Sequence, residues 1–216
     1  MKNLKTAYIL NLCLFALEVF AIGWMMSGLS GGGLSASRLA TLKYFTVDSN
    51  ILMGICALWA AIEHKRVLDG KQDDISPGCY AAQLTGVTGV TLTMLVSAFF
   101  LAPRLGFTFV FQDSNFFLHL VNPVLAIIIF LFFEKSKKIP FRHTFTAVVP
   151  LALYAIYYVV ITLSHYKNGV IEKGYDWYGF FFKGPSSVFI VLPVILVLTY
   201  GISFCLWKLN RKPAAK

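Results

Sequence analysis

Two clusters of polar side chains stand near the starts of apolar segments, and they hold the groups in this chain that are best suited to chemistry. Residues 44–50 read Tyr-Phe-Thr-Val-Asp-Ser-Asn and precede an apolar run to Ile62. A second apolar run begins with Asn115, His119 and Asn122. Hydroxyl, carboxyl, amide and imidazole groups are costly in hydrocarbon, where they commonly mark a site of proton transfer or ligand binding. The two clusters are therefore the candidates for a functional site.

The composition indicates which elements must position these clusters. The 216 residues are 57% hydrophobic and 13% charged, far from a soluble globular profile. About 20 apolar residues suffice for a helix to cross a membrane. The sequence predicts an all-α polytopic membrane protein of one domain, residues 1–216. The predicted transmembrane helices are residues 7–27, 42–62, 80–102, 116–133, 144–164 and 185–207. The first is interpreted as a retained helix and not a cleaved signal peptide, because it is long and contains Glu18.

Basic residues beside the predicted helices indicate an orientation. Of the 19 Lys and Arg residues, thirteen flank one side of the six helices and six flank the other. The richer side holds Lys2, Lys5, Lys65, Arg66, Lys71, Lys135, Lys137, Lys138, Arg142, Lys208, Arg211, Lys212 and Lys216. By the positive-inside rule, both termini are predicted to be cytoplasmic. The net charge of +9 then reflects this topology and attraction to anionic lipid, and we expect no nucleic-acid partner.

Residues 44–50 open the second predicted helix, and their positions divide them between two faces. At about 100° per residue, Thr46, Ser49 and Asn50 share one arc, whereas Asp48 points roughly the other way. Structural roles are open to all three residues of the first face. Thr46 and Ser49 can bond to carbonyls of their own helix, and Asn50 can bridge two helices.

His119 favours a functional interpretation of this face. Pro123 removes the N–H that would bond the carbonyl of residue 119, so the fourth helix is expected to bend at the turn of His119. Both helices run from outside to inside, with Thr46 four residues and His119 three residues below the predicted starts. Both side chains then lie about 5 Å below the outer interface. We therefore predict that Thr46 and His119 meet.

Three other segments carry predictions about packing or access. Thr85, Gly89, Thr93 and Ser97 recur at every fourth position of the third helix, a spacing of small residues that favours close helix packing. Residues 175–182 are rich in aromatic side chains, which fits a belt at the headgroup level or an access route for a substrate. The three glycines at 31–33 form either a plain connector or a flexible cover of an outward-facing site.

The motifs of the two clusters resemble those of a known family. The pattern Tyr-Phe-Thr-x-x-Ser-Asn at 44–50, followed by His-x-x-x-Pro at 119–123 in a six-helix chain, is similar to the androgen-induced-gene family of membrane proteins and its bacterial relatives. The resemblance covers the number and order of the helices, and its motifs are short. Animal members of that family are threonine hydrolases that cleave fatty acid esters of hydroxy fatty acids with one threonine and one histidine.

The resemblance implies a role for each residue of the clusters. Thr46 would be the nucleophile and His119 its general base, with an acyl-Thr46 intermediate that water releases. Asn50 or Asn122, with Ser49 beside Asn50, would bind the substrate or stabilise the oxyanion. The implied partner is a membrane lipid or lipid-ester substrate, without a cofactor. The implied location is the bacterial plasma membrane.

Two carboxylates keep other functions open. Asp48 is a possible accessory that orients His119, although its helical arc points away, and Glu18 is either a structural or a functional carboxylate inside the first helix. A proton-linked transporter would use Glu18, Asp48 and His119 along a path, although no internal repeat is visible. A non-catalytic lipid-binding protein is a third alternative. No metal site is expected, because the His and Cys residues lack ligand spacing. The sequence leaves the oligomeric state open.

Overall fold

The computed structural model describes residues 2–30, 38–136 and 139–211. Within these residues, six helical segments are long and apolar enough to cross a membrane. They are Asn3–Ser27, Phe45–Leu68, Pro77–Leu105, Ser114–Phe133, His143–Ser164 and Pro185–Asn210. The predicted all-α fold with six membrane-spanning helices is confirmed. The glycines at 31–33 and Lys137, Lys138, Lys212 and Lys216 lie outside the described residues, so the predictions made for them stay predictions.

The six spans differ in how regular they are. The first two are α1 (Lys2–Ser27) and α2 (Phe45–Leu68), with a 3₁₀ turn η1 (Arg38–Lys43) between them. The third consists of α3 (Pro77–Val96), a π-helical turn η2 (Ser97–Leu101) and α4 (Ala102–Leu105). A short helix α5 (Phe107–Val110) leads to the fourth span, which comprises α6 (Ser114–Phe116), η3 (Phe117–Val121), α7 (Asn122–Ile128) and η4 (Ile129–Phe133).

The last two spans flank a small hairpin. The fifth span is α8 (His143–Thr146) with α9 (Val149–Ser164), and the sixth is η5 (Pro185–Ser187) with α10 (Val188–Asn210). Between them, β1 (Tyr166–Lys167) pairs antiparallel with β2 (Val170–Ile171). Asn168 and Gly169 in the turn both have positive φ, 51° and 84°, as in a two-residue type I′ hairpin. This hairpin was not predicted from the sequence.

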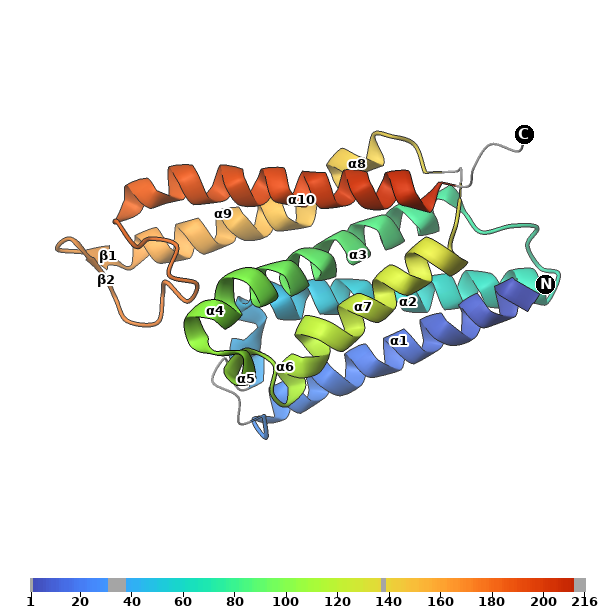
Figure 1. The fold of residues 1–216 in the computed structure, drawn as a ribbon, viewed down its shortest axis with the longest axis horizontal. Coiled ribbons are helices and arrows are strands. Elements are labelled where there is room, and N and C mark those ends of the chain that lie inside the picture. Colours follow the sequence, from blue (N-terminus) through green and yellow to red (C-terminus); the bar gives the residue numbers. More distant parts are fainter. Residues whose placement is uncertain (1, 31–37, 137–138, 212–216) are drawn as a thin grey trace.

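Helix α3 occupies the middle of the bundle (Figure 1). It packs against α2 and α7 on one side and against α9 and α10 on the other, while α1 lies against α2. Buried side chains of all six spans meet in one apolar core, as illustrated by Leu14, Ala57, Leu84, Phe130, Leu151 and Leu206. The start of α1 and the end of α10 lie at the same end of the bundle, as an even number of spans requires (Figure 1).

The predicted packing role of the small residues on α3 is confirmed at Gly89. A Cβ atom at Gly89 would lie 3.2 Å from the Cβ of Ser49, so the α2 and α3 backbones approach closely there. Beside this contact, the hydroxyls of Ser49 and Thr93 are 3.1 Å apart and share a hydrogen bond. The close approach fixes the first two turns of α2, which hold Thr46.

Buried polar side chains add specific contacts between helices. Asn11 on α1 donates to the carboxyl group of Glu134 at 2.7 Å, and His64 on α2 lies 3.3 Å from the same oxygen. Asn50 on α2 donates to the backbone carbonyl of Leu118 in η3 at 3.2 Å. These contacts tie the first, second and fourth spans together near both ends of the bundle. They fix how far each helix is shifted along its neighbours.

The start of the second span differs from its prediction. The sequence placed it at Leu42, but α2 begins at Phe45, because Tyr44 is extended, with φ −97° and ψ 127°. The preceding residues form η1 instead. Thr46 is therefore the second residue of its helix and not the fifth, which brings it close to the hairpin end of the bundle.

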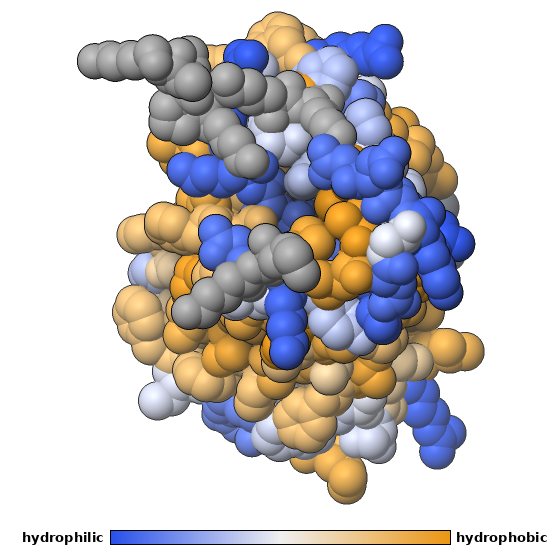
Figure 2. Space-filling view, turned by 90° about the vertical axis from the view of Figure 1, so that its right-hand side faces the viewer, coloured by the Kyte–Doolittle hydropathy of each residue, from blue (hydrophilic) through white to orange (hydrophobic). Residues whose placement is uncertain are grey.

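Charged residues gather at the end of the bundle that carries the start of α1. Figure 2 faces this end, where hydrophilic side chains lie among apolar ones. Exposed basic residues of this end include Lys65, Arg66 and Lys71, at the connection between α2 and α3. The β1–β2 hairpin lies at the opposite end (Figure 1). The charge asymmetry predicts that the hairpin end is outside.

Cysteine labelling tests this orientation. In a variant without native cysteines, Asn168→Cys in the hairpin turn should react with a membrane-impermeant maleimide in intact cells. Asp73→Cys, in the connection between α2 and α3, should react only after permeabilisation. Both positions are exposed, so accessibility within the protein does not limit either reaction. The reverse labelling pattern would overturn the orientation.

Candidate functional site

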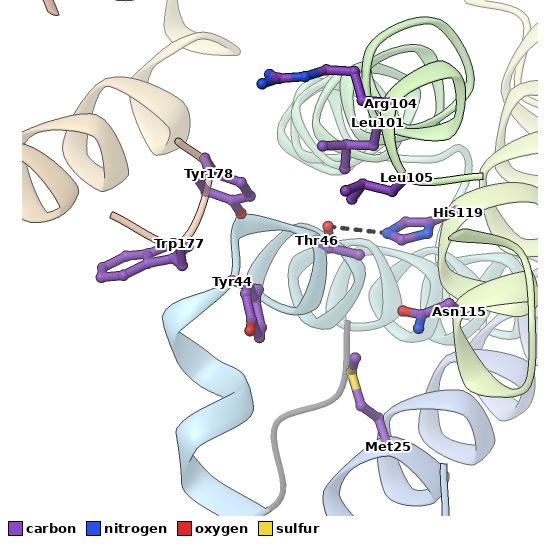
Figure 3. A pocket seen from close by; sticks show the side chains of 10 residues that line it. All are labelled: Met25, Tyr44, Thr46, Leu101, Arg104, Leu105, Asn115, His119, Trp177 and Tyr178. Atoms are coloured by element: carbon purple, nitrogen blue, oxygen red, sulfur yellow. Dashed lines mark hydrogen bonds between the residues drawn. The ribbon is translucent and has the colours of Figure 1, made fainter. Parts of the chain in front are cut away.

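A cavity of about 280 Å³, which we call the Thr46 cavity, lies at the hairpin end of the bundle, where the two polar clusters converge. Its lining comes from α1, α2, α4, the fourth span and the loop after the hairpin (Figure 3). The lining residues are Met25, Tyr44, Thr46, Leu101, Arg104, Leu105, Asn115, His119, Trp177 and Tyr178. A concave site with an apolar wall and a few convergent polar groups is typical of a ligand-binding site.

Thr46 and His119 meet in this cavity, as predicted. His119 Nε2 lies 3.4 Å from Thr46 Oγ1 (Figure 3). This separation is longer than an ordinary hydrogen bond, and catalytic contacts are often loose without substrate. The two residues do not occupy the helix positions expected, since Thr46 is the second residue of α2 and His119 the sixth of its span. They can still meet, because the two spans begin at different points along the length of the bundle.

A backbone carbonyl fixes the proton arrangement of the imidazole. His119 Nδ1 lies 3.0 Å from the carbonyl oxygen of Val110, in the short helix α5. A carbonyl oxygen only accepts hydrogen bonds, so Nδ1 carries the proton and donates. In the neutral ring, Nε2 then presents its lone pair to the hydroxyl of Thr46. His119 is only 2% exposed, which holds the ring in this orientation.

The turn that holds His119 is wider than an α-helical turn. Residues Phe117–Val121 are π-helical, and Pro123 follows at the start of α7. The missing N–H of proline interrupts the regular hydrogen-bond pattern, and single π-helical turns often occur at functional sites. The sequence predicted a bend at the turn of His119, and the structure has a π-helical turn there; the bend itself stays a prediction.

Asn115 is the unpartnered polar group of the cavity. Its side chain is 1% exposed and lines the cavity one turn before His119 (Figure 3). Among the described residues, neither its amide nitrogen nor its amide oxygen has a hydrogen-bond partner. A buried amide without a partner is costly and usually requires an explanation. A polar group of a ligand in the cavity would satisfy it.

The predicted oxyanion residues lie elsewhere. The amide of Asn50 donates to the carbonyls of Thr46 and Leu118, at 2.7 and 3.2 Å, and so uses both of its hydrogens. The Asn122 amide donates to Glu18 at 2.7 Å. Ser49 bonds to the carbonyl of Thr46 and to Thr93. Asn50, Ser49 and Asn122 do not line the Thr46 cavity, and the structure brings Asn115 there instead.

The two predicted accessory carboxylates are also separate from the cavity. Asp48 lines a shallow cleft on the other face of α2, with Tyr154 and Tyr157. Glu18 is buried in the middle of the bundle, where it accepts the hydrogen bond from Asn122. Asp48 thus lies on a different face of α2 from Thr46, as its position in the helix predicted. Of Glu18, Asp48 and His119, only His119 lines the Thr46 cavity and only Asp48 lines this cleft.

The aromatic loop forms one wall of the cavity. The hydroxyl of Tyr178 accepts a hydrogen bond from the backbone N–H of Phe45, at 2.8 Å, which caps the start of α2. Burial raises the pKa of Tyr178 well above its ordinary value, so the phenol stays neutral. Trp177 lies beside it, with the ammonium of Lys43 5.8 Å from its ring centre. The loop thus takes part in the site.

Two further properties limit which ligands the cavity could bind: its positive charge and its lack of a metal-ligand cluster among the described residues. Arg104, on α4, is exposed at the cavity and lies 4.9 Å from the centre of the Phe100 ring. It is the positively charged lining residue, so the cavity suits an anionic or polar group at this rim. Within the described ranges, no group of three or more His, Cys, Asp or Glu residues could hold a metal ion.

The chain was compared with protein-family models, curated proteins and solved structures, and none of the three comparisons gives a significant match. Function is therefore inferred from the geometry of the cavity and from the motifs in the sequence.

The tautomer of His119 can be measured directly. In protein with ¹⁵N-labelled histidine, the ring-nitrogen shifts of His119 should report a protonated Nδ1 and an unprotonated Nε2 near neutral pH. The Val110 carbonyl is the reason, because it can accept only from an N–H. A His119→Gln variant identifies the signal. A protonated Nε2 with a bare Nδ1 would contradict the orientation and remove the acceptor for the Thr46 proton.

Proposed function

We propose that the protein is an integral membrane hydrolase of lipid esters, with Thr46 as nucleophile and His119 as general base, as in the family that its motifs resemble. The observation that carries this proposal is the 3.4 Å contact between Thr46 Oγ1 and the unprotonated Nε2 of His119 inside a cavity. A hydroxyl next to a base whose orientation is fixed by a third group is the arrangement of an activated nucleophile. Here the third group is a backbone carbonyl and not a carboxylate.

The proposed reaction has two stages. Thr46 Oγ attacks the ester carbonyl while His119 Nε2 takes the hydroxyl proton, and the tetrahedral adduct forms. The adduct collapses as the protonated His119 gives its proton to the leaving alkoxide, which departs as an alcohol, and acyl-Thr46 remains. Water then attacks the acyl group with His119 again as base, and the carboxylic acid is released. No cofactor takes part in these steps.

Asn115 is the best-supported donor for the oxyanion. Its NH₂ group has no partner among the described residues, and it lies on the cavity wall with His119. A donor that is already fixed in a water-poor site stabilises developing charge without reorganisation. This assignment replaces Asn50 and Asn122 in the proposal, because neither lines the cavity: Asn50 uses both amide hydrogens within the protein, and Asn122 donates to Glu18.

The substrate class follows from the position and charge of the cavity. A site at the end of a transmembrane bundle suits an amphiphile with apolar chains and a polar group near the interface. Arg104 at the cavity would bind a carboxylate, as the free acid group of a fatty acid ester of a hydroxy fatty acid provides. We propose the bacterial plasma membrane as the location and membrane lipid as the partner.

Kinetics on a lipid-ester substrate test the nucleophile and base. Thr46→Ala and His119→Ala should each abolish most turnover, and the double variant should be little worse than either single one, because the two residues act as one unit. Thr46→Ser should keep partial activity, since it retains the hydroxyl and loses only the methyl group that restricts the rotamer. A fluorophosphonate should modify Thr46 in the wild type.

The matched control is Thr85→Ala, which removes a threonine hydroxyl that bonds only to its own helix, at 3.0 Å from the carbonyl of Ala81. All variants must match the wild type in yield and thermal stability in detergent. A well-folded Thr46→Ala protein with unchanged hydrolysis would end the nucleophile assignment. Lipid binding without turnover in the wild type would favour the non-catalytic alternative, and substrate flux without turnover would favour the transporter.

Asn115 and Asn50 should respond differently to removal of the amide. Asn115→Ala should lower kcat by about 10²–10³-fold through loss of an oxyanion donor, with little change in thermal stability because no protein group loses a partner. Asn50→Ala should destabilise the fold by about 1–3 kcal/mol, since the Leu118 carbonyl then stays buried without this donor. Equal kcat for Asn115→Ala and the wild type would remove Asn115 from the mechanism.

A further inference from the structure

A second cavity shares a wall with the Thr46 cavity, and a groove in turn shares a wall with the second cavity. The second cavity is narrow, about 70 Å³, and lies between α2, α3, α9 and α10. Thr46, Leu101 and Tyr178 line both this narrow cavity and the Thr46 cavity. Thr46 therefore lies where the Thr46 cavity, with its polar groups, meets the narrow cavity.

The narrow cavity leads on to a wider groove. This groove, about 580 Å³, lies between the end of α3 with η2 on one side and α10 on the other. Val96, Phe180 and Ile195 line both the narrow cavity and the groove. Three adjoining spaces thus run from Arg104 past Thr46 to the flank of the bundle.

The groove opens on the surface that faces hydrocarbon. Its lining is apolar, and Phe99 and Ile190 are exposed although both belong to membrane-spanning segments. Large apolar side chains exposed at membrane depth contact lipid tails. The groove is therefore accessible from within the bilayer and not only from water.

Three of the polar side chains beside the narrow cavity, Thr93, Tyr154 and Tyr158, already have partners. The Thr93 hydroxyl bonds to the carbonyl of Gly89 and to Ser49, both at 3.1 Å. The Tyr154 hydroxyl donates to the carbonyl of Lys43, and the Tyr158 hydroxyl donates to Asp176. A ligand in this space has few hydrogen bonds to gain, so the space suits a hydrocarbon chain. Its small volume favours a single unbranched one.

We propose that the narrow cavity and the groove bind the acyl chain of the ester, which enters sideways from the bilayer between η2 and α10. The ester carbonyl then lies beside Thr46, where the two cavities meet. The polar alcohol part lies in the Thr46 cavity with Asn115 and Arg104. This inference rests on the proposed hydrolysis, because it assigns the two sides of the scissile bond to different spaces. Acyl-chain length is selected at Ile195, whose side chain borders the narrow cavity and the groove.

Photolabelling locates the chain without requiring hydrolysis. The probe is a long-chain fatty acid with a diazirine near its methyl end, added to the full-length protein in lipid nanodiscs and mapped by mass spectrometry. We expect labels within residues 95–100 and 190–198, in the wild type and equally in Thr46→Ala. Ile195→Trp should reduce this labelling about tenfold or more by filling the path.

Hydrolysis of two esters distinguishes a blocked path from a general defect. Ile195→Trp should lower kcat/KM for a long-chain ester about tenfold or more but leave an acetyl ester of the same alcohol unchanged, because the acetyl group does not reach Ile195. The control is Val197→Trp, on the same helix but 71% exposed and outside both spaces, which should behave as the wild type. Ala155→Leu narrows the path from α9 and repeats the test if Ile195→Trp is unstable.

The outcomes separate this inference from the proposed function. Labels on α1 or α5, or labelling and chain preference that Ile195→Trp and Ala155→Leu leave unchanged, would overturn the acyl path. Labels in the groove that Ile195→Trp removes would support it, even if Thr46→Ala hydrolysed esters normally. That last result would reject the nucleophile assignment and leave an acyl-binding site.

Discussion

Within a bilayer, polar groups have no water to bond to, so they must find partners inside the protein. This constraint accounts for much of the structure. Asn11 and His64 meet Glu134, Asn122 meets Glu18, and Asn50 reaches the backbone of the fourth span. Each contact joins two helices and so fixes how they are shifted against one another. Each of these side chains has at least one partner, whereas both polar atoms of the Asn115 amide have none among the described residues.

The same constraint explains why the proposed Thr46–His119 dyad has a backbone carbonyl and not a carboxylate as its third group. A carboxylate beside His119 would place a charge in a site with little water, and burying a charge is costly. The carbonyl of Val110 instead directs the imidazole through an uncharged hydrogen bond. This arrangement requires that α5, which lies between α4 and α6 in the sequence, folds back against the bundle so that the Val110 carbonyl reaches the ring.

The sequence predicted the six spans, because apolar length depends on side chains alone. It also predicted the contact of Thr46 with His119, but the equal depths that motivated this prediction were counted from span starts that the structure places elsewhere. It did not predict the start of α2, which depends on one extended residue, Tyr44. The role of Val110 has no sequence signature, since every residue has a carbonyl. Asn115 could not be ranked above Asn50, because the carbonyls that occupy Asn50 come partly from another helix. The Asn168–Gly169 turn has a local sequence signal, because Asn-Gly is a favoured pair in two-residue hairpin turns.

The hydrogen bond between Tyr178 and the first N–H of α2 connects the loop after the hairpin to the turn that carries Thr46. An event that moves this loop, such as the binding of a ligand against Trp177 or of a partner to the loop, also changes the restraint on the threonine. By thermodynamic reciprocity, occupancy beside Thr46 must alter the affinity of any such partner to the same extent. A molecule on the loop and a ligand beside Thr46 can thus influence each other without touching.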